Sequence, residues 1–385
     1  MKLQLNEEDK VGSAVRFIRG KGSIFTSSGR KIYIEPEAIT FFNGLNDYDQ
    51  IQVAKEIETI ASIPSPQDGW VQKLRPAFFK AKGFKSNFIL KYQLTSESAI
   101  ISAIELNLAL LGSQAKTKNE RTCLYKIKRF GEPKPFKEKM SLEEVNNLTS
   151  AWGKPIPVTS VTTRHAAVNG MLNDLDKARW LMGTHLDTAY PKDLATEYTL
   201  FHNPTEGGGL DLYESAVDSI FGGMTENAKA LAAVLKDIQL NGSKTKWIVH
   251  SQGGIIFKQA LKYHARNYPD ISLNKNMVVF HAGGNNKNET SRLMNKTGIK
   301  RAAPDRDNPF DLVPNIAGRN DLSTASIKRS LSFLPKVAGK SISGTRVESP
   351  HTLPFLSLEA YHRFLTLAGD SRSAAKVKKY MKSFN

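Results

Sequence analysis

The stretch Lys246–Phe257 reads KWIVHSQGGIIF, and it predicts the local structure on which the rest of the chain depends. It begins as a short apolar run rich in β-branched residues, which favours a strand. After His250-Ser251-Gln252 the pattern becomes helical and continues until Pro269. A strand, a sharp turn and a helix would lift the Ser251 hydroxyl out of a sheet. The two glycines that follow would let the helix start close to the strand.

Ser251 therefore has the sequence context of a catalytic nucleophile. Hydrolases with a G-x-S-x-G motif present their serine on such a turn, and the first amides of the helix face the negative charge that develops. Here Val249 replaces the first glycine, so we expect crowding where helix and strand approach. The alternative interpretation is that Ser251 only caps the helix.

A serine nucleophile needs a base and an acid that orients the base, and in this type of hydrolase they follow in the order serine, acid, histidine. Downstream of Ser251, we favour Asp311 as the acid because it precedes Val-Pro by two residues, a recurrent acid position in such hydrolases. Asp305 and Asp307 compete for the role on the same loop.

Two histidines follow the candidate acid, His351 and His362. His351 lies in a loop immediately before a predicted helix, and His362 lies inside that helix. Because a loop histidine can reach over the edge of a sheet, we expect His351 to be the base. The alternative for His351 is an exposed histidine without a partner.

An oxyanion hole needs two backbone N–H groups directed at the developing charge. The amide of Gln252 is the first candidate. The second should come from the loop after an earlier strand, which we expect to be His202–Gly209. Pro204 has no N–H, so Asn203 and Thr205 are the candidates there.

The chain from about residue 160 alternates strands and helices, as in a mostly parallel α/β sheet with flanking helices. Strands are expected at Glu197–His202, Asn276–His281 and Gly298–Ala303, and a helix at Thr225–Ile238.

The N-terminal region has a different pattern and predicts a smaller β-rich or α+β region. Strands are expected at Val11–Ile18, Ser23–Thr26 and Lys31–Ile34, a strand or helix at Gln50–Ile60, and an apolar helix at Ser96–Leu111.

These patterns predict three parts: a basic accessory region at residues 1–150, an α/β domain at 155–370 and a basic tail at 371–385, helical or loose. The linker is expected either in the basic, proline-containing stretch Lys116–Lys139 or at Pro155–Pro157.

From Tyr198 to Tyr361 the chain resembles the α/β-hydrolase superfamily, and within it bacterial lipase- or esterase-like members with an H-S-Q-G-G elbow. The matching pieces are His202–Gly207, Asp211–Ser215, Trp247–Phe257 and Asp311–Pro314. The resemblance implies a serine hydrolase that cleaves carboxylic esters, with lipid esters among the candidate substrates, through an acyl-enzyme and with no metal and no cofactor. Only one clear helix separates the Asn203 loop from the elbow strand, where the full fold would place a further strand. The first 150 residues match no family known to us.

A second hypothesis is a non-catalytic binding or structural protein of a larger assembly that keeps the hydrolase fold, because fold does not fix function.

The charge balance bears on partners. The formal net charge is +17 at pH 7, from 54 Lys and Arg against 37 Asp and Glu. It favours an anionic membrane surface or, as a weaker hypothesis, nucleic acid, although basic charge also serves solubility alone. Between Lys73 and Lys91 lie six basic residues and no acidic one, interleaved with aromatics. This segment fits a nucleic-acid contact, a membrane interface or an ordinary strand with solvated lysines.

Other features exclude some classes. There is no run of eighteen apolar residues and no signal-peptide core, so we expect a cytoplasmic protein or signal-independent export. The single cysteine, Cys123, excludes an internal disulfide and is expected to be a buried small residue. His185 and Asp187 form an H-x-D pattern without further metal ligands, and Gly207–Gly209 lacks the lysine of a phosphate-binding loop.

Overall fold

The computed structural model describes residues 30–62, 67–73, 87–107, 123–133, 151–170, 173–203, 225–333 and 349–383. Contacts divide the chain into two compact units. The smaller comprises Met1–Cys123 and Pro157–Ser160, and the larger comprises Leu124–Ile156 and Val161–Asn385. The division after Cys123 lies earlier than the boundary near residue 150 that we predicted.

In its described part, the smaller unit contains a four-stranded sheet with the order β1-β4-β3-β2 and the two helices α1 and α2. Strand β1 runs parallel to β4, whereas β3 runs antiparallel to both of its neighbours. Its elements are β1 (Lys31–Ile34), α1 (Pro36–Gly44), α2 (Asp47–Ala61), β2 (Gln67–Lys73), β3 (Phe88–Leu94) and β4 (Ser98–Leu106). The strand predicted at Lys31–Ile34 is confirmed. The open choice at Gln50–Ile60 is settled as helix, while the strands expected at Val11–Ile18 and Ser23–Thr26 lie outside the described residues.

The helix that we predicted at Ser96–Leu111 is wrong, because β4 occupies the described part of that range. A tight turn causes the reversal from β3: Thr95 N–H donates to Ser98 O (2.9 Å), and Thr95 Oγ1 accepts from Ser98 N–H (2.9 Å). Ala99 and Ile101 are fully buried and alternate with partly exposed neighbours, which is the period of a strand. Pairing with β3 thus overrides an apolar run that is compatible with either structure.

The described end of the basic-aromatic segment is an ordinary strand. In β3 the rings of Phe88 and Tyr92 are buried, while Lys91 on the other face forms an ion pair with Glu105 (2.5 Å). For these residues the interpretation of a strand with a solvated lysine is confirmed, and residues 74–86 lie outside the described part.

A seven-stranded sheet has the order β11-β10-β9-β7-β8-β5-β6, and all of it except the boundary strand β6 belongs to the larger unit. Its described ladders from β11 to β8 are all parallel. The strands are β5 (Cys123–Lys128), β6 (Ile156–Val158), β7 (His165–Val168), β8 (Glu197–His202), β9 (Thr245–His250), β10 (Asn276–His281) and β11 (Lys300–Arg301). This arrangement confirms the predicted α/β class with a mostly parallel sheet. Strand β5 belongs to this sheet, and Tyr125 and Ile127 within it are buried. The stretch Lys116–Lys139 is therefore not a simple linker.

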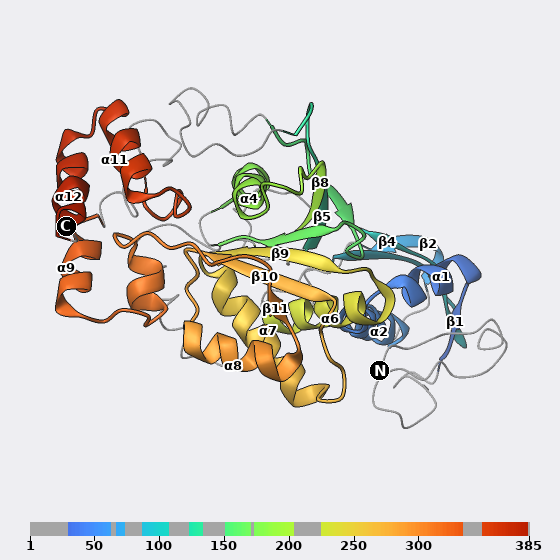
Figure 1. The fold of residues 1–385 in the computed structure, drawn as a ribbon. Coiled ribbons are helices and arrows are strands. Elements are labelled where there is room, and N and C mark those ends of the chain that lie inside the picture. The colour runs from blue at the N-terminus through green and yellow to red at the C-terminus, as the bar shows by residue number, and fades with distance from the viewer. Residues whose placement is uncertain are drawn as a thin grey trace. The chain divides into compact units, whose positions relative to one another are not determined.

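Helices cover both faces of this sheet. Figure 1 shows α4 (Leu175–Ala189) on one face and α6 (Glu226–Asn241), α7 (Gly253–Asn267) and α8 (Lys287–Thr297) on the other. Asp174 caps α4 and Thr225 caps α6 by accepting hydrogen bonds from N–H groups of the first turn, as predicted for Thr225. Among the described helices, none is both long and apolar enough to cross a membrane.

The remaining helical elements gather at one side of the larger unit (Figure 1). They are the π-helical turn η3 (Val313–Ala317), α9 (Thr324–Leu331), α11 (Leu358–Leu367) and α12 (Ser371–Met381). The predicted basic tail is thus mostly the helix α12. Its Ala374 and Val377 pack against Tyr361 and Leu365 of α11, so the tail is part of this unit rather than a loose end.

The strand order sets the place where a ligand would bind. From β7 the chain passes to β8 on one side, whereas β9, β10 and β11 follow on the other side of β7. In such open sheets the crevice lies beyond the carboxyl ends of the two strands where the order reverses. Those strands are β7 and β9, which end at Val168 and His250. In the sheet, β7 lies between β8 and β9. No strand from the chain segment that joins β8 to β9 is therefore required at that position.

The start of α7 lies very close to the end of β7, as the elbow motif predicts. A Cβ atom added to Gly253 would lie 2.8 Å from Val168 O and 3.0 Å from Asn169 O. Val249 is fully buried in the sheet, where it pairs with Val168 and Phe280. The close approach thus takes place at Gly253 and not at Val249.

Gly253→Ala is expected to lower the free energy of unfolding by roughly 1–3 kcal/mol, because backbone carbonyls cannot move aside for the new methyl group. Gly44→Ala is the control, since a Cβ at Gly44 meets nothing within 4 Å. Urea unfolding of both variants checks this. Equal midpoints for Gly253→Ala and the wild type would contradict the close packing.

Candidate active site

Ser251 lies on the sharp turn that joins β9 to α7. Its backbone has φ of 57°, a left-handed conformation that is uncommon for a residue other than glycine. Two hydrogen bonds of 2.9 Å, from Gly254 N–H and Gly284 N–H, hold the Ser251 carbonyl. The residue is 6% exposed. An unfavourable backbone conformation held by its surroundings is a frequent property of functional positions.

The loop after β7 lies directly against Ser251. A Cβ atom added to Gly170 would lie 2.3 Å from Ser251 Cβ and 2.7 Å from Ser251 Oγ. Only a residue without a side chain fits there, so the backbone of Gly170 borders the hydroxyl. This contact places the Asn169-Gly170 turn beside the candidate nucleophile.

Asp311 and His351 form a close pair. His351 Nδ1 lies 2.7 Å from Asp311 Oδ2, and the Asp311 side chain is fully buried while that of His351 is 16% exposed. A carboxylate accepts only, so His351 Nδ1 carries the hydrogen and Nε2 is left as the basic nitrogen. Asp311 Oδ1 accepts a second hydrogen bond from Val313 N–H (3.0 Å) at the start of η3. The structure thus pairs the two residues that we predicted as acid and base.

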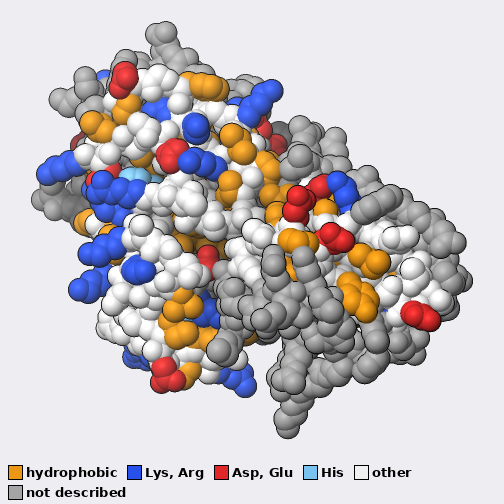
Figure 2. Space-filling view, turned by 90° about the vertical axis from the view of Figure 1, so that its right-hand side faces the viewer, with side chains coloured by type: hydrophobic (Ala, Val, Ile, Leu, Met, Phe, Trp, Pro, Cys, Tyr) orange, Lys and Arg blue, Asp and Glu red, His pale blue; other side chains and the backbone are white. Residues whose placement is uncertain are grey.

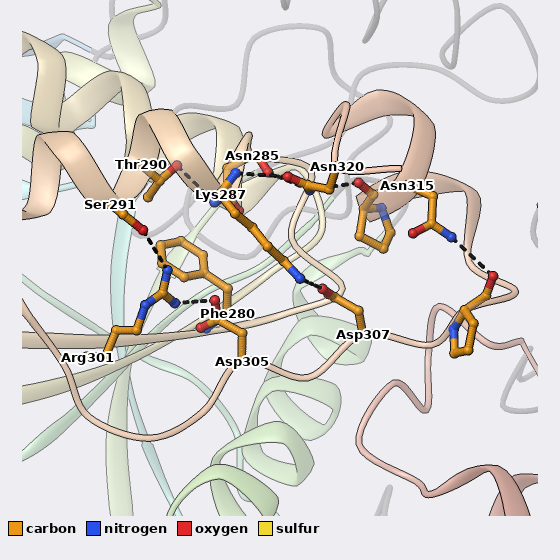
Figure 3. A network of polar contacts seen from close by, with 12 residues as sticks. Phe280, Asn285, Lys287, Thr290, Ser291, Arg301, Asp305, Asp307, Asn315 and Asn320 are labelled. Carbon is orange, nitrogen blue, oxygen red and sulfur yellow. Dashed lines mark hydrogen bonds and ion pairs between the residues drawn. The ribbon is translucent and has the colours of Figure 1, made fainter. Parts of the chain in front are cut away.

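The two competing aspartates have other partners, which Figure 3 shows. Asp305 accepts a hydrogen bond from Phe280 N–H (3.1 Å) and forms an ion pair with Arg301. Asp307 forms an ion pair with Lys287 (2.5 Å), and burial raises the pKa of its carboxyl although Lys287 opposes the shift. Both carboxylates fasten the loop after β11 to β10 and α8. Among the three, only Asp311 contacts a histidine.

An amide network in the same view fastens the segment that carries Asp311 (Figure 3). Asn320 Nδ2 donates to Asn285 O (3.0 Å) and to Pro314 O (2.8 Å), and Asn315 Nδ2 donates to Pro309 O (3.1 Å). Asn285 lies in the loop after β10 and donates from its own Nδ2 to Thr290 Oγ1 (2.9 Å). The η3 turn is therefore tied to the loop that also binds the Ser251 carbonyl.

Asn203 is not a suitable oxyanion donor, contrary to our expectation. Its backbone N–H donates to Asn169 Oδ1 (2.7 Å), and its carbonyl accepts from Asn169 Nδ2 (2.9 Å). Its side chain instead reaches the elbow, because Asn203 Nδ2 donates to Gln252 Oε1 (2.8 Å). Thr205, the other candidate, lies outside the described residues.

Gln252 remains a candidate oxyanion donor. It is the N-cap residue of α7, where backbone N–H groups have no intrahelical acceptor and the helix dipole favours negative charge. The bonds that link Asn169, Asn203 and Gln252 tie the ends of β7 and β8 to this N-terminus.

His351 reaches the elbow through its neighbour His250. His250 Nε2 lies 2.9 Å from the backbone oxygen of His351, and the two rings have centroids 4.6 Å apart. Since His250 directly precedes Ser251, this contact places the Asp311–His351 pair beside the turn. No hydrogen bond joins Ser251 Oγ to His351 in the described structure. Such catalytic hydrogen bonds are often long before substrate binds.

Buried histidines line the inner side of the site. His185 Nδ1 lies 3.0 Å from His281 Nδ1, and the rings of His185 and His250 have centroids 4.5 Å apart. Burial lowers the pKa of His281 to about 3 and holds those of His185 and His250 well below the ordinary value. These imidazoles are therefore neutral at physiological pH.

The H-x-D pattern does not build a metal site. On α4, His185 contacts His281, whereas Asp187 forms an ion pair with Arg129. Burial raises the pKa of Asp187 to about 6, although Arg129 opposes the shift. Within the described residues, no group of three or more His, Cys, Asp or Glu side chains could hold a metal ion. Gly207–Gly209 and the Cys123 side chain lie outside the described part.

Sequence analysis missed Asn169, Gly170 and His250 as parts of the site. Strand β7 has only four residues, two of them alanines, so its signal is weak. The Asn-Gly dipeptide after it is a turn signal that marks the end of a strand. His250 was visible inside the motif, but nothing in its spacing indicates a contact with a residue 101 positions later.

The buried histidines predict loss of stability in acid. Among the described residues, His202 has no hydrogen-bond partner for either ring nitrogen, and burial lowers its pKa to about 4 from the ordinary 6.5. Below pH 6.5, this histidine is protonated in the unfolded chain but stays neutral in the folded chain until the pH approaches 4. Each such histidine therefore lowers the free energy of unfolding by up to about 1.4 kcal/mol per pH unit as the pH falls toward its folded pKa.

The test compares His202→Phe with the wild type by urea unfolding at several pH values between 4.5 and 7.5. Below pH 6.5, the free energy of unfolding of the variant should fall less steeply with decreasing pH. The difference in slope should be up to about 1.4 kcal/mol per pH unit, which is the contribution of one buried histidine. Asp187, whose raised pKa changes stability with pH in the opposite direction, is present in both proteins. Its contribution therefore cancels in the difference between their slopes. Identical slopes would contradict a neutral, buried His202.

Comparison with known proteins adds no family assignment. No family model matches the chain, and no curated protein matches it either. The geometry of the site is therefore the main indication of function.

Proposed function

We propose that the larger unit is a serine hydrolase that cleaves carboxylic esters through an acyl-enzyme. The observation that carries the proposal is the Asp311–His351 pair beside a serine held in a left-handed turn at the switch point of a parallel sheet. Serine, acid and histidine follow in the chain order of the α/β-hydrolase superfamily, which the sequence resembles.

The proposed chemistry uses only side chains and backbone of this chain. Ser251 Oγ attacks the ester carbonyl carbon, and His351 Nε2 takes the hydroxyl proton and returns it to the leaving alcohol. Asp311 stays ionised and holds the imidazole through Nδ1–H. Water then attacks the acyl-enzyme by the same proton path and releases the acid. No metal and no cofactor is needed for these steps.

Backbone amides would stabilise the oxyanion of the tetrahedral intermediate. The Gln252 N–H at the start of α7 is one donor, and we assign the second to the loop that begins at Gly170, because Gly170 borders Ser251 Oγ. A donor of this kind is worth on the order of a hundredfold in rate. Asn203 and Asn169 would hold both donors in position through the hydrogen bonds of their side-chain amides.

An anionic lipid is the substrate class that we favour within esters. The net charge of +17 favours anionic surfaces. In the view of Figure 2, Lys and Arg side chains gather along the left edge with few Asp or Glu among them. A basic surface would draw the protein to an anionic membrane, where a lipid ester is available to Ser251. The competing hypothesis is a non-catalytic binding protein, consistent with the absence of a Ser251–His351 hydrogen bond in the described structure.

Ser251→Ala is expected to lower ester turnover by about a thousandfold or more, because the nucleophile is lost. The assay follows p-nitrophenyl esters of increasing chain length, together with labelling by a fluorophosphonate. The exposed Ser332 provides the control variant, Ser332→Ala. A folded wild type that neither turns over any ester nor takes the label would reject the hydrolase and favour the non-catalytic protein.

Asp311→Asn is expected to lower kcat by about a thousandfold or more, because the amide no longer holds the His351 tautomer that leaves Nε2 basic. Asp307→Asn is the matched control. Its ion pair with the half-exposed Lys287 is worth about 1 kcal/mol or less, so kcat should change by about fivefold at most even if all of that energy were lost from the transition state. Comparable losses in both variants would contradict the choice of Asp311.

A further inference from the structure

The imidazole of His250 binds the main chain of the candidate base. His250 Nε2 lies 2.9 Å from the carbonyl oxygen of His351. A carbonyl oxygen accepts only, so the hydrogen of this bond belongs to His250 Nε2. The neutral ring then has an unprotonated Nδ1, which is buried and has no hydrogen-bond partner in the described structure. His250 is thus held as one defined tautomer.

The surroundings of His250 keep it neutral. The titratable and charged groups around it are His185 and Lys177 of α4, His281 of β10 and His351 of the loop before α11. All are neutral or positive, and no carboxylate in the described structure contacts the ring. Burial and these neighbours lower its pKa far below the ordinary value. A protonated His250 would have no partner for its second N–H.

The same histidine stack supports the His351 loop at a second point. The ring of Phe355, four residues after His351, packs edge-on against His185 with centroids 5.4 Å apart, and it lies tilted against His281 with centroids 6.1 Å apart. The histidine stack therefore contacts the loop at His351, through a hydrogen bond and a ring contact from His250, and at Phe355, through two further ring contacts. Within the stack, only His250 contacts the residue that carries the base, and its hydrogen bond is the one contact that fixes the His351 main chain.

We infer that His250 is a positioning residue for the base: its Nε2–H holds the His351 main chain so that the imidazole stays on Asp311 and beside Ser251. This inference rests on the proposed function for its catalytic meaning, but the contact itself does not. Its neutrality matters, because His351 becomes positive when it takes the serine proton. A second cation with its ring centre 4.6 Å away would oppose that step.

The test uses variants that differ in one donor. The amide nitrogen of His250→Gln can occupy the place of Nε2 and donate, whereas His250→Met fills similar space without a donor. His264→Met is the matched control. His264 is also buried and binds a carbonyl through Nε2 (2.7 Å to Ile271 O), but it lies near the far end of α7.

His250→Met should lower kcat for a p-nitrophenyl ester on the order of tenfold to a hundredfold, because small displacements of a catalytic group are costly. KM should change little, and His250→Gln should recover most of kcat. His264→Met should leave kcat near the wild-type value. Equal kcat in His250→Met and the wild type, or equal losses in His250→Met and His250→Gln, would overturn the inference.

A second measurement separates this inference from the proposed function. Proton NMR of the wild type should show a downfield His351 Nδ1–H resonance from the bond to Asp311, assigned by its loss in Asp311→Asn. The resonance should weaken or exchange faster in His250→Met and persist in His250→Gln. If the wild type turns over no ester but this pattern appears, the proposed activity fails and the positioning role stands. No such resonance in the wild type, or no change in His250→Met, overturns the positioning role.

If His250→Met does not fold, His250→Asn replaces it, because an asparagine amide is too short to reach the place of Nε2. The comparison of Asn with Gln then decides by the same criteria.

Discussion

The contact between the first turn of α7 and the end of β7 constrains the whole of the larger unit. Gly253 lies so close to the Val168 and Asn169 carbonyls that a Cβ would overlap them. A helix that starts this close to a neighbouring strand forces the chain to reverse sharply after β9, and Ser251 takes up that reversal with a positive φ. The reversal turns the Ser251 carbonyl toward the N–H groups of Gly254 and Gly284. The positions of α7, the loop after β10 and the hydroxyl are thus set together.

Two groups of neutral polar side chains stabilise the loops on either side of this turn. On one side, Asn169 and Asn203 exchange amide hydrogen bonds and reach Gln252. On the other, uncharged imidazoles stack beneath the His351 loop. Neutral groups are suited to this task because a buried charge without a partner is costly. The buried carboxylate of Asp311 is tolerated because both of its oxygens accept hydrogen bonds.

Features that are formed by residues close together in the sequence could be predicted, whereas features that depend on contacts between distant residues could not. The elbow at Ser251 was predictable because adjacent residues form it, and the cap at Thr225 for the same reason. Asp311 could be favoured from its spacing to Val-Pro, but Asp305 and Asp307 could not be excluded from the sequence, because tertiary partners decide among the three. Asn203 was assigned to the wrong task because the order of β7 and β8 in the sheet is not visible in the chain. The strand β4 was missed because its apolar run fits a helix until β3 pairs with it.

The net positive charge of the protein and the groups around Ser251 would affect different steps, the approach of an ester and its reaction. Among the described residues, the groups placed near Ser251 are the backbone of Gly170, the side-chain amides that reach Gln252 and the imidazoles of His250 and His351, with Asp311 as the buried charge of the proposed triad. Many of the lysines and arginines lie on the surface, where salt screens their fields over about 10 Å. Their effect on a reacting carbonyl inside the crevice is therefore small, whereas their combined field can concentrate an anionic surface near the protein. In the proposed hydrolase, the surface charge would determine which esters arrive, and the neutral surroundings of Ser251 would determine whether they react.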